Sequence, residues 1–86
     1  MPTISMFYGI LIRMFYDDHN PPHIHVLYNE YESVYNFEGE QIDGEALPGK
    51  QHKLVQAWIE IHKDELTANW KLAKYGEQMF KIEPLR

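Results

Sequence analysis

The sequence predicts a small α+β domain: an antiparallel sheet of three to four strands in the N-terminal half, packed against one long helix or two consecutive helices in the C-terminal half. Before residue 44, apolar residues alternate with polar ones in short runs that Gly, Pro, Asn and Asp interrupt. After Pro48-Gly49, apolar residues recur at helical spacing. A chain of 86 residues has room for one domain, residues 1–86.

The first strand is expected at residues 7–16, where the chain alternates for longest. On one side of an extended chain lie Tyr8, Ile10, Ile12, Met14 and Tyr16, and on the other lie Gly9, Leu11, Arg13 and Phe15. The first set is the more apolar and is expected to face the core. Arg13 is therefore expected on the opposite side of the sheet.

A rigid loop and a hairpin are expected next. Residues 17–22 combine Asp and Asn with two prolines, which favour turns and stiffen the backbone. Residues 23–28 and 31–37 alternate again, and Asn29-Glu30 between them predicts a two-residue turn. A further short strand at Gln41-Ile42 would make the fourth.

The register of this hairpin positions two histidines. Ile24 and Val26 occupy the core side of their strand, so His23 and His25 are expected to project together from the other side and to be at least partly accessible. Pairing through the two-residue turn sets His25 opposite Val34.

The C-terminal half is expected to be helical up to Gly76, a residue that suits the position just after a helix. The apolar residues at helical spacing include Leu54, Val55, Trp58, Ile59, Ile61, Leu66, Trp70 and Ala73. Nothing between His62 and Glu65 forces a break, so one bent helix and two consecutive helices both fit. Residues 77–86 retain apolar side chains and are expected to pack back on the domain or to add a strand.

Composition restricts location and chemistry. The chain has no cysteine, so any metal site must use His, Asp and Glu. It has no apolar run long enough for a signal peptide or a membrane span, so the expected location is the cytoplasm, away from membranes. The formal net charge of -5 argues against binding of nucleic acid through bulk charge and would require a local basic patch.

The histidine-rich segment is the candidate site. Side chains at positions i and i+2 of a strand share a face, so His23 and His25 can meet at one atom. His19 and an oxygen from Asp17 or Asp18 would complete a tetrahedral site for a divalent metal such as zinc, or leave a position open for water. The candidate metal ligands are Asp18, His19, His23 and His25.

Two other interpretations of the segment stay open. Without a metal, His23 and His25 could act as general acid and base, and Arg13 could bind a phosphate beside them; these three are the candidate catalytic residues. Alternatively, Pro21-Pro22 fixes a turn and the histidines only satisfy nearby carbonyl groups. An aromatic row of Tyr28, Tyr31 and Tyr35 could also form a surface for a protein partner.

Several motifs together resemble a known family. They are Met1-Pro2-Thr3-Ile4, the block from Asp18 to His25 (Asp-His-Asn-Pro-Pro-His-Ile-His), the helix residues Trp58, His62, Glu65-Leu66 and Asn69-Trp70, and the closing Lys81-Ile82-Glu83-Pro84-Leu85. With them the chain resembles the small bacterial domain-of-unknown-function family 4160 (DUF4160) nearly end to end.

The resemblance implies a role but no chemistry. It implies the toxin component of a type II toxin–antitoxin-like module, neutralised by a small partner of the DUF2442 family. The residues themselves leave two alternatives open: a histidine-dependent or metal-dependent nuclease or hydrolase acting alone, and a non-catalytic protein-binding module.

Overall fold

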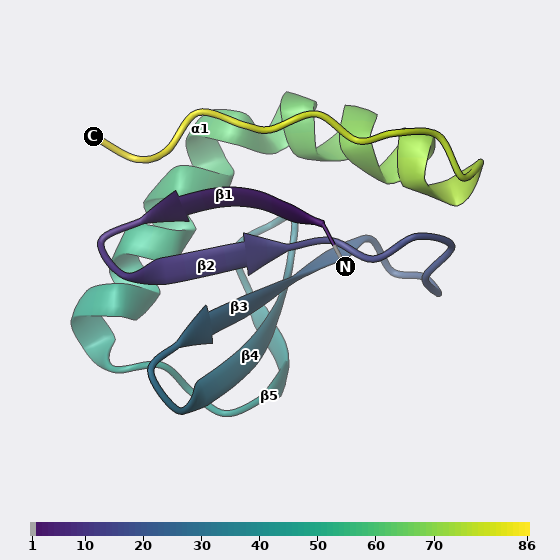
Figure 1. The fold of residues 1–86 in the computed structure, drawn as a ribbon. Coiled ribbons are helices and arrows are strands. Elements are labelled where there is room, and N and C mark those ends of the chain that lie inside the picture. Colours follow the sequence, from purple (N-terminus) through teal and green to yellow (C-terminus); the bar gives the residue numbers. More distant parts are fainter. Residues whose placement is uncertain (1) are drawn as a thin grey trace.

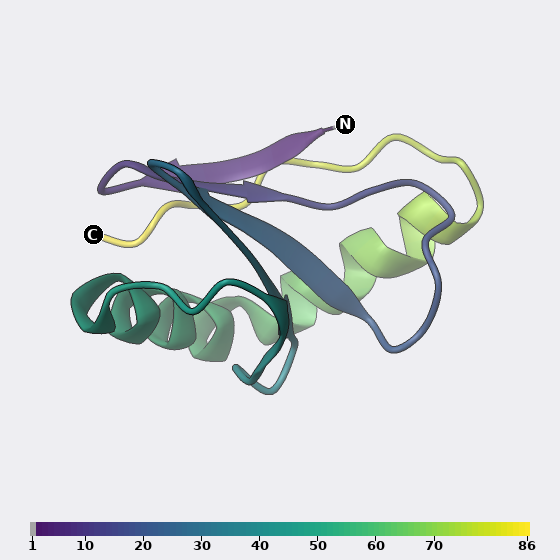
Figure 2. The same ribbon diagram turned by 90° about the horizontal axis from the view of Figure 1, so that it is seen from below.

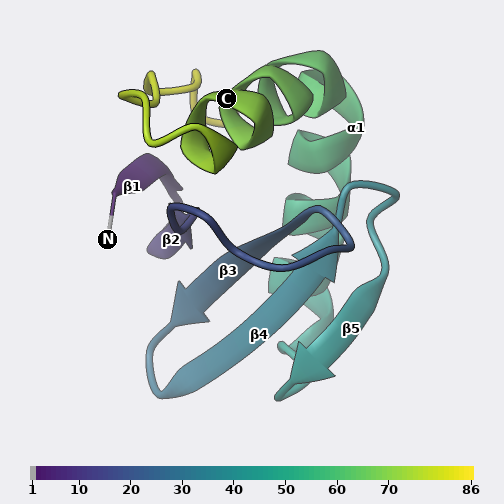
Figure 3. The ribbon, with the colours of Figure 1, turned by 90° about the vertical axis from the view of Figure 1, so that its right-hand side faces the viewer.

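A computed structural model describes residues 2–86 of the chain (Figure 1). The elements are β1 (Thr3–Phe7), β2 (Ile10–Arg13), β3 (His23–Tyr28), β4 (Tyr31–Asn36), β5 (Gln41–Gly44) and α1 (Gly49–Lys74). The strands form one antiparallel sheet in the order β1-β2-β3-β4-β5 (Figure 3). The α+β class is as predicted, but the prediction of three to four strands is wrong, because the sheet has five.

The fifth strand comes from the N-terminal segment. The run expected as one strand at residues 7–16 turns back at Tyr8-Gly9, so β1 and β2 form a hairpin. Both turn residues have positive φ angles, 49° and 77°, as a type I′ hairpin turn requires. Ile10 and Ile12 are buried as predicted, but Tyr8 lies at the turn and is largely exposed. The alternating pattern runs through the turn and conceals it.

The predicted pairing of β3 with β4 is confirmed. His25 lies opposite Val34, and the positive φ of Asn29, 49°, fits the two-residue turn that joins the strands. The short strand expected at Gln41-Ile42 is present as part of β5, which pairs with β4 at the edge of the sheet. Strands β3 and β4 are therefore paired in the expected register, which places the expected residues on the outer face of the sheet.

Helix α1 covers one face of the sheet, so that the domain has two layers (Figure 2). Its buried residues are Val55, Trp58, Ile59, Leu66, Asn69, Trp70 and Ala73. At His62 the backbone leaves the helical region, with φ -111° and ψ 22°, and the helix changes direction (Figure 1). Of the two arrangements expected from the sequence, the structure has the single bent helix, and the bend lies at His62. Gly76 follows it with a φ of 71°, as predicted.

The segment after the helix returns along β1, which forms one edge of the sheet (Figures 1 and 2). The Ile82 N–H donates a hydrogen bond of 2.7 Å to the Ile4 carbonyl. Met79 and Ile82 are buried in the common core. The expectation that the tail packs back on the domain is confirmed, and the tail shields part of an otherwise open strand edge.

Two helix side chains hold this tail. The Asn69 side chain, which is fully buried, donates to the Phe80 carbonyl at 2.8 Å and accepts from the Phe80 N–H at 3.0 Å. The Trp58 indole N–H donates to the Glu83 carbonyl at 2.8 Å. These bonds satisfy buried backbone groups of a segment that has no strand partner of its own. Asn69 and Trp58 are therefore residues of the fold.

The expected aromatic row does not form an outer surface. Tyr35 faces the helix and is fully buried, and Tyr28 and Tyr31 are partly buried against the same core. The Tyr35 hydroxyl shares a 2.6 Å hydrogen bond with Nδ1 of His52, in the first turns of α1. Only Tyr28 and Tyr31 keep part of their surface accessible, and the protein-binding alternative stays a prediction.

Tyr35→Phe is expected to lower the free energy of unfolding by about 1 kcal/mol near neutral pH, because His52 loses its partner. Burial raises the pKa of Tyr35 above its usual value of 10.0. Since the folded pKa is the higher one, the stability is present below about pH 10 and is lost as the pH rises through the folded pKa. Urea unfolding of both proteins should therefore show their difference shrinking above about pH 10, by up to roughly 1.4 kcal/mol per pH unit. A difference that stays constant in alkali would contradict the prediction.

Candidate metal centre

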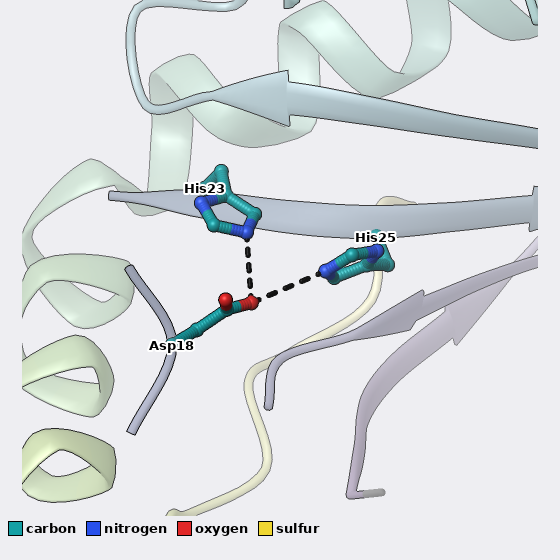
Figure 4. Close-up of side chains that lie close together, drawn as sticks. All are labelled: Asp18, His23 and His25. Atoms are coloured by element: carbon teal, nitrogen blue, oxygen red, sulfur yellow. Dashed lines mark hydrogen bonds and ion pairs between the residues drawn. The ribbon is translucent and has the colours of Figure 1, made fainter. Parts of the chain in front are cut away.

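The loop between β2 and β3 carries Asp18 to the start of β3. The N–H of the preceding residue, Asp17, donates to the Ala73 carbonyl at 3.1 Å. Ala73 lies in the last turn of α1, where carbonyl groups lack helical partners. Asp17 adopts a positive φ of 49°, which Asp tolerates better than most residues. The loop is thereby attached to the helix, and the Asp18 carboxylate points toward β3 (Figure 4).

Asp18, His23 and His25 converge on one another (Figure 4). Nε2 of His23 lies 2.9 Å from Oδ2 of Asp18, and Nε2 of His25 lies 3.5 Å from the same oxygen. One potential ligand atom of each residue lies within 4.8 Å of the others. The side chains are 14%, 4% and 26% exposed, respectively, so the group is largely shielded and open mainly at His25. We call these three residues the Asp18 cluster.

The hydrogen bond made by Nδ1 of His23 indicates where the proton of a neutral His23 ring lies, and hence whether Nε2 carries one. Nδ1 of His23 lies 2.7 Å from the Pro21 carbonyl oxygen. A carbonyl only accepts hydrogen bonds, so Nδ1 carries the proton. In a neutral imidazole Nε2 then holds a lone pair, and this lone pair faces the Asp18 carboxylate at 2.9 Å. Two acceptors at that distance require positive charge between them, either a second ring proton or a metal cation.

The Asp18 carboxyl is held in its charged form. Burial raises the pKa of Asp18. Hydrogen bonds from the His19 N–H and His25 and the proximity of His23 lower it by more in total, so that the pKa lies below the usual value of 3.8. The bond from the His19 N–H is 2.9 Å long. Asp18 is therefore a carboxylate at neutral pH, the form that ligates cations.

Not every predicted ligand joins the cluster. Nδ1 of His19 lies 2.9 Å from the other Asp18 oxygen, Oδ1, but its side chain is 85% exposed and lies outside the Asp18 cluster. The expectation that both strand histidines are accessible is wrong for His23, which packs 5.4 Å from the Trp70 ring. The sequence pattern gave no sign that the end of α1 would cover this position.

Arg13 lies beside the cluster, as its strand position predicted. Four residues on successive strands form a row across the outer face: Arg13 pairs with His25, His25 with Val34, and Val34 with Asp43. Phe15 stacks on His25, with ring centroids 4.1 Å apart and an angle of 18° between the rings. The stack fixes the orientation of the His25 imidazole, which is the most exposed side chain of the Asp18 cluster.

Two adjoining pockets flank His25. The smaller, of about 250 Å³, is lined by His19, Pro21, His23, His25, Val34, Ile42 and Asp43. The larger, of about 410 Å³, is lined by Arg13, Phe15, His25, Leu27, Glu32, Ser33, Val34, Asp43 and Gly44. His25, Val34 and Asp43 belong to both. Asp43 directly follows the strand expected at Gln41-Ile42, and the observed strand β5 extends two residues farther and includes it.

Residues 9–71 match the sequence model of a family described as a domain of unknown function (DUF4160). The chain belongs to this family. The part that matches DUF4160 includes Arg13 and the whole Asp18 cluster, whereas the tail that packs on β1 follows it. Searches of curated proteins and of solved structures gave no match. Over residues 2–86, no helix is both long and apolar enough to cross a bilayer.

Proposed function

We propose that this DUF4160 chain is a hydrolase that depends on a divalent cation held by Asp18, His23 and His25. The observation that carries the proposal is the direction of His23 Nε2, which faces the Asp18 carboxylate while Nδ1 donates to the Pro21 carbonyl. Histidines that ligate metals almost always donate their other ring N–H in this way. Two imidazoles and one carboxylate suit zinc and leave a coordination position open.

A cation at this position would polarise the bond to be cleaved and activate water. The chain's own residues have separate tasks. Asp18 and His23 are the shielded ligands, fixed by the loop anchor and by Pro21. His25 borders both pockets and is held by its stack on Phe15, so it orients the open side of the site toward the outer face.

The competing account is a metal-free site in which His23 carries both ring protons and forms an ion pair with Asp18. It corresponds to the histidine-dependent enzyme, with His25 available for proton transfer. A shared proton fits the 2.9 Å contact directly, whereas a tetrahedral metal ion with bonds of about 2.0–2.1 Å would need the two atoms roughly 0.5 Å farther apart.

Zinc titration of chelator-treated protein tests the proposal. Calorimetry is expected to show about one zinc ion per chain, from the one cluster found among the described residues. Zinc at about 100 times its Kd should stabilise the fold by about 2.7 kcal/mol in urea unfolding. His19→Ala, a histidine change in the same loop, should retain binding, and Asp18→Asn should weaken it by at least roughly 10-fold. Absence of binding for zinc, manganese and ferrous iron alike would leave the metal-free account.

We also propose a biological setting: the toxin component of a two-protein module in the cytoplasm, neutralised by a small DUF2442-like partner. Membership in the DUF4160 family supports this, since the resemblance to that family implies such a module. Induced expression of the chain should slow growth, and co-expression of the neighbouring small protein should restore it and co-purify with the chain. If expression has no effect and no complex forms, the toxin role fails while the hydrolase proposal stands.

A further inference from the structure

The substrate of the site can be inferred from the residue next to the cluster. Arg13 in β2 and His25 in β3 are direct partners, and side chains at paired positions of neighbouring strands share a face. Both residues line the larger pocket. The Arg13 side chain therefore lines the same pocket as His25, one of the residues that would hold the metal.

The Arg13 side chain lacks a partner of its own. Among the described residues no carboxylate lies within ion-pair distance of it. Its Nε is buried and has no hydrogen-bond acceptor. A buried donor without an acceptor is unfavourable. No described carboxylate balances the charge of the guanidinium group, so an anionic ligand in the pocket would do so.

We propose that the substrate is a small phosphate ester whose phosphate is bound by Arg13 at the metal site, an inference that rests on the proposed hydrolase function. A guanidinium fork matches phosphate geometry. Arg13 pairs with His25, a proposed metal ligand. The anionic group that Arg13 binds is therefore also the group that reacts at the metal. A phosphate ester carries this charge, whereas the carbonyl of a carboxylic ester or amide is neutral.

The surrounding charges restrict the size of the substrate. The exposed carboxylates Glu32 and Asp43 border the same pocket as Arg13, and the chain has a net charge of -5. These charges repel a polyanion, which is bound through several cations together. A pocket of about 410 Å³ fits a small molecule. The substrate class is therefore a single phosphate ester and not a polynucleotide.

The reaction needs no further reactant. A bond forms between the oxygen of water and phosphorus, and the bond between phosphorus and the alcohol oxygen breaks. The proton that water loses is transferred to the departing alcohol. The products are inorganic phosphate, or a phosphate with one ester fewer, and the alcohol.

Calorimetry with the zinc-loaded full chain tests this inference, with inorganic phosphate as the probe. Phosphate should bind the wild type, and Arg13→Ala should raise its Kd by at least about 10-fold, as expected for loss of charge-assisted hydrogen bonds. Arg86→Ala, which changes the only other arginine, should leave the Kd unchanged. Arg13→Lys keeps the charge and the aliphatic stem and should fall between. Acetate and a single-stranded oligonucleotide should bind much more weakly than phosphate.

The outcomes separate this inference from the proposal beneath it. If zinc binds but phosphate does not, or if Arg13→Ala and Arg13→Lys bind phosphate like the wild type, the phosphate-ester inference is wrong and the metal site stands. If the oligonucleotide binds more tightly than phosphate, the substrate is a polynucleotide. If zinc itself does not bind, both fail together. A nitrophenyl phosphate assay should agree, with a raised KM in Arg13→Ala and an unchanged KM for nitrophenyl acetate.

Discussion

His25→Ala is expected to lower the zinc-dependent hydrolysis of a phosphate ester by at least roughly 10–100-fold while the chain stays folded. His25 supplies one of the three potential ligands and borders both pockets. Its side chain is partly exposed and contributes to no buried backbone bond, so its removal should cost little stability. Hydrolysis rates at saturating zinc, together with thermal melts, measure the two effects separately.

His23→Ala is the less informative companion. His23 is buried, packs near Trp70 and bonds with both Pro21 and Asp18, so its loss combines ligand removal with destabilisation.

A growth assay gives a second measurement with His25→Ala. Expression of the wild type should inhibit growth, and expression of His25→Ala should not. A folded His25→Ala protein that still hydrolyses the ester at the wild-type rate would refute the cluster as the site. Persistent growth inhibition without hydrolysis would instead indicate a toxin that acts by binding.

Trp58→Ala is expected to lower the free energy of unfolding by about 3–5 kcal/mol. The side chain is fully buried, lies 5.5 Å from the Phe7 ring, and donates its indole proton to the Glu83 carbonyl. The substitution thus opens a cavity between the layers and releases the tail. Equilibrium urea unfolding measures the loss.

Two variants calibrate this experiment. Trp58→Phe keeps most of the ring volume but loses the bond to Glu83, so it should cost less than the alanine change and report on the attachment of the tail. Tyr75→Ala, at a side chain that is 78% exposed, should change stability by less than about 0.5 kcal/mol. A loss below about 1 kcal/mol for Trp58→Ala would place Trp58 outside the core.

Patterns with a fixed period predicted the middle of the sheet and the helix. The β3–β4 hairpin followed from period-two alternation around Asn29, and a slip by one residue would have moved Ile24 and Val26 out of the core. The same alternation placed Arg13 and His25 on one face. This was enough to propose the three catalytic candidates and the two metal ligands in β3.

Features set by tertiary contacts were not predictable in this way. The Tyr8-Gly9 turn interrupts no hydrophobic pattern, and the bend at His62 has neither proline nor glycine to announce it. The burial of His23 depends on Trp70, which lies far along the chain. Asp43 joins the site only because β5 extends beyond its apolar residue. Each depends on how distant elements meet, which local periodicity does not encode.

The contact between the tail and β1 has a consequence for synthesis of the protein. Ile4 is synthesised well before its partner Ile82, and Trp58 is synthesised before its partner Glu83. Contacts of such long sequence separation form slowly and late. The two layers can close fully only after the tail has emerged, so the nascent chain stays incompletely folded until then. Under the proposed toxin role, the chain would thereby be inactive while it is being made.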